Sequence, residues 1–119
     1  MGYAYNALKE AFYSEQSASI LLVDYDLLTK GPAKTMSLIY QFLGEEPFEH
    51  DFENVQYEEP EFDNRLQTKG LHQVRAQVEF KPRTTILPPD LFERFDRLSF
   101  WTEATNSRAS AIVAKAKET

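Results

Sequence analysis

Residues 20–44, ILLVDYDLLTKGPAKTMSLIYQFLG, decide the fold class of this chain. They predict a buried strand at about 20–25, a short acidic connector, and an amphipathic helix over 33–43 that ends at Gly44. A strand without polar alternation needs cover on both faces and neighbours on both edges. No other segment is an equally convincing partner. We therefore expect an α/β fragment, mainly helical, in which one buried strand is flanked by helices.

The remaining elements are predicted from their local signals. Periodic apolar residues favour a helix over 3–16, and Asp26 is expected to cap the turn after the strand. An extended arm with one helical turn is expected over 45–63, and a short turn of helix or strand at 74–78. The sequence LPPDLF (87–92) starts a helix that should run to about Leu98, with Leu91, Phe92 and Phe95 buried. Phe100 and Trp101 should pack back onto the body, followed by a tail over 102–119, frayed or helical at 109–117.

Composition restricts the class of protein. At 119 residues the chain is at most one domain, and its 42% hydrophobic content is that of a folded protein. The absence of cysteine excludes disulfides and thiolate chemistry. The longest aliphatic run, 20–23, is too short to span a membrane, and the first ten residues lack the layout of a signal peptide. A cytoplasmic protein without membrane partners is the expectation.

The net charge of −6 conceals two blocks of opposite sign. Every charged residue between 45 and 63 is acidic, whereas 65–83 carries mainly Lys and Arg. The overall acidity argues against nucleic-acid binding, which needs an extended basic surface. The basic block has two interpretations: it neutralises the acidic arm, or it binds one small anionic ligand.

Few residues are arranged for chemistry. The four glycines are isolated, so no glycine-rich phosphate loop is present, and His50 and His72 lack the spacing of metal ligands. We predict no metal site and name no catalytic residue. The segments GLHQVR (70–75) and FKPR (80–83) place His72, Arg75, Lys81 and Arg83 in a short irregular stretch. Arginine offers planar bidentate donors to phosphate, so these four residues form a candidate phosphate clamp, with ion pairing to the acidic arm as the alternative.

Several pieces resemble the bacterial sulfotransferase family. In chain order they are NALKEAFY (6–13), LVDYDL (22–27), YQFLG (40–44), FEHDFENV (48–55), EFD (61–63), GLHQVR (70–75), PR (82–83), ILPPDLF (86–92) and SFW (99–101). By this resemblance, residues 1–101 are the C-terminal portion of a P-loop-like sulfotransferase fold. Such enzymes transfer a sulfuryl group from 3′-phosphoadenosine 5′-phosphosulfate (PAPS) to a hydroxyl or amine.

The resemblance also assigns the candidate residues. Arg83 and Lys81 are expected to contact the 3′-phosphate of PAPS or of its product PAP, with His72 and Arg75 next. The family's loop for the 5′-phosphosulfate precedes the part that this sequence matches. We therefore expect the chain to be inactive alone and to associate with an N-terminal portion or with a second copy of itself. The alternative is a non-catalytic, self-associating module.

Overall fold

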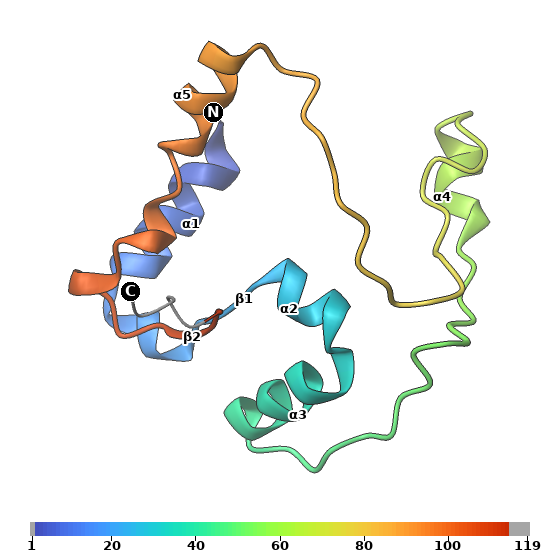
Figure 1. The fold of residues 1–119 in the computed structure, drawn as a ribbon, viewed down its shortest axis with the longest axis horizontal. Coiled ribbons are helices and arrows are strands. Elements are labelled where there is room, and N and C mark those ends of the chain that lie inside the picture. Colours follow the sequence, from blue (N-terminus) through green and yellow to red (C-terminus); the bar gives the residue numbers. More distant parts are fainter. Residues whose placement is uncertain (1, 115–119) are drawn as a thin grey trace. The chain divides into compact units, whose positions relative to one another are not determined.

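The computed structural model describes residues 2–114, and the chain divides into two compact units. The first comprises Met1–Leu27 with Lys81–Thr119, and the second comprises Leu28–Phe80. Five α-helices, three short 3₁₀ helices and two strands make up the described part (Figure 1). The predicted mixed α/β class, with more helix than strand, is confirmed. Positions 115–119 of the predicted tail lie outside the described residues.

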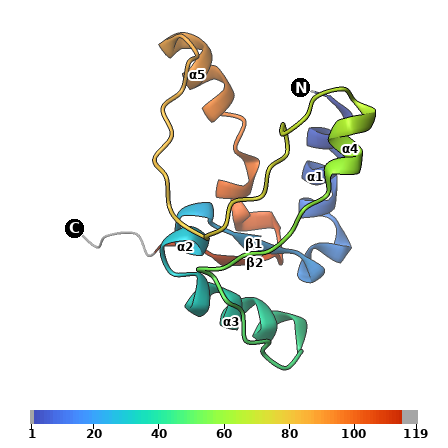
Figure 2. The ribbon, with the colours of Figure 1, turned by 90° about the vertical axis from the view of Figure 1, so that its right-hand side faces the viewer.

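A two-stranded parallel sheet belongs to the first unit. Strand β1 (Leu21–Val23) pairs with β2 (Ser110–Ile112), and the two lie side by side in Figure 2. The Ser110 N–H also donates to the Ile20 carbonyl at 3.0 Å, which extends the pairing toward the start of β1. Parallel strands require a long connection, and here the whole segment between them supplies it.

The strand predicted at about 20–25 is confirmed at 21–23, but it is shorter and less buried than predicted, and its partner was missed. The observed strand has three residues, all half-buried, and it has a partner in 110–112, which the sequence assigned to a frayed helix. Of the three residues of β2, Ser110 and Ala111 have little strand propensity, and only Ile112 favours a strand. Its conformation follows from tertiary pairing with β1, which no local pattern predicts.

The first helix ends earlier than predicted. Helix α1 spans Tyr3–Tyr13, and a 3₁₀ helix, η1, spans Glu15–Ser19. Ser14 separates them, because its Oγ donates to the Ala11 carbonyl and accepts the Gln16 N–H. A serine that bonds its neighbouring backbone offers an alternative to the helical ladder, which explains the break.

Aromatic side chains form the small core of the first unit. Phe12 is 2% exposed and is the only buried apolar side chain among residues 2–114. Its ring meets those of Tyr13 and Phe100 edge to face, at centroid distances of 5.0 and 5.5 Å. Tyr5 also contacts Phe100, at 5.4 Å. The predicted return of Phe100 onto the body is confirmed, whereas Trp101 contacts Phe100 but stays 47% exposed.

Polar contacts fix the segment after α5 against α1. This segment contains two 3₁₀ helices, η2 (Phe100–Thr102) and η3 (Ala104–Asn106). The Tyr5 hydroxyl donates to the Leu98 carbonyl at 2.9 Å. Buried Ser17 accepts the Arg108 N–H at 3.1 Å, just before β2 begins. The path of the chain into β2 is thus fixed by hydrogen bonds to the amino-terminal helices.

Helix α2 (Tyr25–Lys30) begins shortly after β1. Its capping residue is Asp24, whose Oδ1 accepts the Leu27 N–H at 3.0 Å. The prediction that Asp26 caps this turn is therefore wrong by two residues. Asp26 lies in the first turn, where a carboxylate still interacts favourably with the positive end of the helix.

Helix α3 (Pro32–Leu43) confirms the predicted helix and both of its end signals. Proline occupies the first turn, and Gly44 terminates the helix in the left-handed conformation, at φ 70°. On the predicted apolar stripe, Met36, Ile39 and Tyr40 are half-buried and Leu43 is 59% exposed, whereas the one buried residue of the helix is Thr35. The local signals thus predicted the boundaries of α3 and, in part, the face that packs inward.

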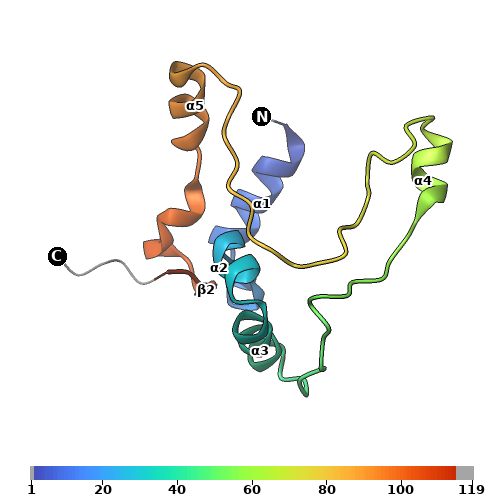
Figure 3. The ribbon, with the colours of Figure 1, turned by 45° about the vertical axis from the view of Figure 1, so that its right-hand side comes forward.

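The rest of the second unit consists of two extended limbs joined through α4 (Pro60–Arg65) (Figure 3). We call residues 45–59 the outgoing limb and residues 66–80 the returning limb. The Val55 N–H donates to the Ala76 carbonyl at 2.7 Å, and the Val78 N–H donates to the Phe52 carbonyl at 2.8 Å. The predicted arm with one helical turn is confirmed. The short segment predicted at 74–78 is an irregular pairing with the outgoing limb rather than a strand or helix.

His50 anchors the beginning of the outgoing limb. Its Nε2 lies 2.9 Å from the Tyr40 hydroxyl, and its ring lies between Phe48 and Phe52, with centroids 4.9 and 5.6 Å away. The residue is half-buried. The contacts show a structural histidine that joins α3 to the limb.

Helix α5 (Pro89–Asp96) begins at the predicted proline pair and ends two residues before Leu98. The prediction that its apolar side is buried is wrong, because Leu91, Phe92 and Phe95 are 36%, 48% and 43% exposed. Their spacing sets them on one face, but the first unit does not bury that face. None of the helices in the described part of the chain has the length and apolar content needed to cross a bilayer.

Candidate functional site

Arg83 lies over the ring of Tyr25, the residue that begins α2 shortly after strand β1 ends. Its guanidinium is 5.7 Å from the centre of the Tyr25 ring, and Tyr25 follows the last residue of β1 by two positions. The residue is exposed, and it has no hydrogen bond or ion pair with the described residues beyond this contact. A cation over an aromatic face is attracted by the negative ring charge and keeps its N–H donors available. Tyr25 therefore positions Arg83 without occupying its donors.

Lys81 precedes Arg83 on the same extended segment. Both belong to the first unit, and both are exposed. Lys81 is engaged in an interaction of its own. Lys81 and Arg83, the two residues expected first to contact the 3′-phosphate, therefore lie two positions apart where the chain re-enters the first unit.

His72 lies in the second unit and forms a dyad with Asp63. Its Nδ1 is 2.5 Å from Asp63 Oδ1, and its backbone N–H donates to Asp63 Oδ2 at 2.9 Å. Asp63 is 5% exposed, whereas the His72 side chain is 58% exposed. The backbone N–H of His72, and after it the imidazole, hold the pKa of the Asp63 carboxyl below its ordinary value. Asp63 thus acts as a charged acceptor that orients the imidazole.

One hydrogen bond and one backbone conformation complete the turn that brings these residues together. The Thr68 N–H donates to the Asp63 carbonyl at 2.9 Å, and Gly70 adopts a left-handed conformation at φ 77°. A glycine meets this requirement without the strain that a Cβ atom would cause. Gly70, which begins the GLHQVR segment, therefore shapes the turn before His72.

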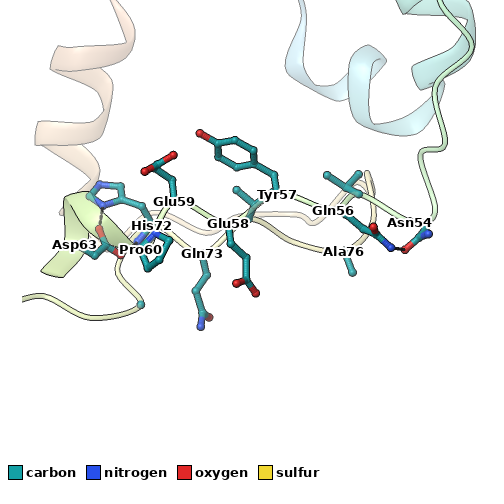
Figure 4. A pocket seen from close by; sticks show the side chains of 13 residues that line it. Asn54, Gln56, Tyr57, Glu58, Glu59, Pro60, Asp63, His72, Gln73 and Ala76 are labelled. Atoms are coloured by element: carbon teal, nitrogen blue, oxygen red, sulfur yellow. Dashed lines mark hydrogen bonds and ion pairs between the residues drawn. The ribbon is translucent and has the colours of Figure 1, made fainter.

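A groove of about 860 Å³ lies between the two limbs and reaches the dyad (Figure 4). Its lining residues are Asn54, Val55, Gln56, Tyr57, Glu58, Glu59, Pro60, Asp63, Gly70, His72, Gln73, Val74 and Ala76. They include three carboxylates and neither lysine nor arginine. Arg75 is exposed and is not among the lining residues.

A second cavity, of about 470 Å³, lies in the first unit between α1 and residues 96–103. Tyr5, Lys9 and Tyr13 line it from the helix, and the opposite wall includes Ser99 and Glu103. The tyrosine hydroxyls on this wall already bond backbone carbonyls of the facing segment. The cavity is thus crossed by structural hydrogen bonds.

The four residues of the predicted clamp divide between the two units. Lys81 and Arg83 belong to the first, and His72 and Arg75 belong to the second. Their expected contacts with the nucleotide stay predictions. Sequence reasoning missed Asp63 as the partner of His72, because one acidic residue in an acidic run carries no individual signal.

The described residues contain no group of three or more His, Cys, Asp or Glu side chains that would hold a metal ion. No protein-family model, curated protein or solved structure matches this chain. The functional argument therefore depends on the residues and their geometry.

Proposed function

We propose that this chain is the C-terminal part of a PAPS-dependent sulfotransferase of P-loop-like fold. It would contribute cationic contacts to the nucleotide, while the loop that binds the 5′-phosphosulfate comes from another portion. The acceptor is an unassigned hydroxyl or amine. This proposal starts from the resemblance of the nine sequence pieces and is supported by the position of Arg83.

The contact of Arg83 with Tyr25, two residues beyond the end of a parallel strand, is the observation that carries the proposal. In open α/β sheets, ligands bind outside the carboxyl ends of parallel strands. Arg83 lies over Tyr25, just beyond that end of β1, with its guanidinium donors available. A guanidinium in this place suits bidentate recognition of a phosphate. Lys81, two residues earlier, adds a second cation to the segment.

The chemistry expected of the chain itself is electrostatic. The nucleotide supplies the sulfuryl group, and Arg83 would hold the phosphate that fixes the position of the nucleotide. Fixed cations stabilise the negative charge of such a ligand at no further cost of reorganisation. Orientation of the donor is a large part of catalysis in group transfer. The proposed contribution of this chain is therefore binding and positioning, and no catalytic residue is assigned to it.

A thermal-shift titration with PAP tests the proposal, with adenosine as the ligand that lacks phosphates. PAP should raise the melting temperature and adenosine should not. Arg83→Gln should remove most of the rise. Arg94→Gln, which makes the same charge change on exposed α5, should preserve it. A flat response to PAP, alone and with an N-terminal sulfotransferase portion supplied, would contradict the nucleotide role.

The second candidate is a non-catalytic module that associates with a second copy of itself. The observation in its favour is the exposed apolar surface: Phe12 alone is buried among the apolar side chains of residues 2–114, and α5 presents its apolar face. Each strand of the two-stranded sheet also has an outer edge without a sheet partner in the described residues. Open edges and apolar faces favour pairing between chains. Light scattering after size-exclusion chromatography should give twice the chain mass, and a monomer would contradict this role.

A further inference from the structure

The Asp63–His72 dyad leaves one imidazole nitrogen available to a ligand. Asp63 accepts from Nδ1, so the neutral ring presents Nε2 as a hydrogen-bond acceptor. Nε2 has no hydrogen-bond partner among the described residues, and His72 lines the groove. The dyad thus presents a fixed acceptor to the groove.

Two neighbouring side chains extend to the same side of the outgoing limb as the His72 ring. Figure 4 shows Tyr57 and Glu59 on this side, with Glu58 and Gln73 on the opposite side. The alternation is that of an extended chain, in which residues two apart share a face. Tyr57 is 59% exposed, so its ring is accessible to solvent.

This face combines three groups that suit a positively charged hydrogen-bond donor. Glu59 offers a carboxylate, His72 offers the Nε2 lone pair, and Tyr57 offers the negative face of an aromatic ring. The groove lining contributes no lysine or arginine to repel a cation. A primary ammonium group carries one charge and three N–H donors, and it matches this combination.

We propose that the face formed by Tyr57, Glu59 and His72 binds a primary ammonium group. A polyamine and a lysine side chain are the two sources of that group. The site lies entirely within the second unit. It therefore stands independently of the proposed contact between Arg83 and the nucleotide.

Isothermal titration calorimetry with spermidine and with tetralysine tests the proposal. Saturable binding of either probe supports the site. Tighter binding of tetralysine assigns a lysine-bearing peptide, and tighter binding of spermidine assigns a small polyamine. Absence of saturable binding of both probes overturns the proposal.

A matched pair of variants distinguishes a site from general attraction to an acidic chain. Glu59→Gln should weaken binding about fivefold, as expected for the loss of one exposed charged contact. Glu58→Gln removes the same charge from the adjacent residue on the opposite side, and it should change affinity by less than about twofold. Equal weakening by both variants would overturn the proposed site.

His72→Gln tests the imidazole directly and should also weaken binding about fivefold. Because His72 also holds the turn, its amide and that of Thr68 should be compared by NMR with those of the unchanged protein. Loss of affinity with the turn intact supports a ligand contact. Unchanged affinity with the turn intact overturns the role of Nε2.

Discussion

Replacing Phe12 with alanine should lower the free energy of unfolding of the first unit by about 3 kcal/mol. Phe12 is 2% exposed, and its ring makes edge-to-face contacts with Tyr13 and Phe100. Full burial of a phenylalanine contributes roughly 1.5–3 kcal/mol. Each aromatic pair adds about 0.5–1 kcal/mol. The higher helix propensity of alanine returns about 0.5 kcal/mol, which leaves the stated loss.

Urea unfolding followed by circular dichroism measures this change, and a thermal scan provides a second measurement. For a chain of this length, a loss of this size lowers the melting temperature by about 12 °C. Leu8→Ala is the matched control, since Leu8 lies on the same helix but is 64% exposed. It should cost less than about 0.5 kcal/mol. Equal effects of the two substitutions would refute the conclusion that Phe12 is the centre of the core.

Three further predictions follow from the Asp63–His72 pair, from the backbone conformation of Gly44 and from the hydrogen bond to Ser17. The pKa of the Asp63 carboxyl is lowered by the backbone N–H of His72 and then by its imidazole. The turn should therefore keep its full stability above the ordinary carboxyl pKa of about 3.9 and lose it as the pH falls through the lower pKa of the folded state. An NMR titration of the His72 amide with a midpoint of about 3.9 or higher would contradict this prediction. Gly44→Ala should cost about 1 kcal/mol in urea unfolding because of the left-handed backbone at φ 70°, whereas Gly2→Ala, with open space around it and a negative φ, should be neutral. Ser17→Ala should cost about 1 kcal/mol, because it leaves the Arg108 N–H without its acceptor, and a loss no greater than that of exposed Ser19→Ala would count against this role.

The contrast between α3 and β2 shows what local patterns predict. The ends of α3 follow from Pro32 and Gly44, whose backbone preferences act over one turn and are readable in the sequence. Strand β2 depends on pairing with residues nearly ninety positions earlier, and two of its three residues have little strand propensity of their own. The exposed face of α5 is a related failure, since periodicity indicates an apolar face but not what covers it.

The candidate site residues show the same contrast between chemistry that residue type predicts and positions that only folding decides. Sequence composition picks out the cations at 81 and 83 and His72, because residue type alone gives their chemistry. The partners that position them, Tyr25 for Arg83 and Asp63 for His72, lie 58 and nine positions away in the chain. No spacing rule connects residues that meet only when the chain folds.

The sequence by itself determined the α/β class, the ends of α3, the start of α5 and the separation of an acidic block from a basic one. These properties depend on residue type and on contacts within a few positions. Only the tertiary structure decided the parallel partner of β1, the small aromatic core around Phe12 and the dyad that orients His72. The first two join segments nearly ninety positions apart, where closure of the intervening loop must be offset by many contacts at once, and the dyad joins two residues nine positions apart across a turn.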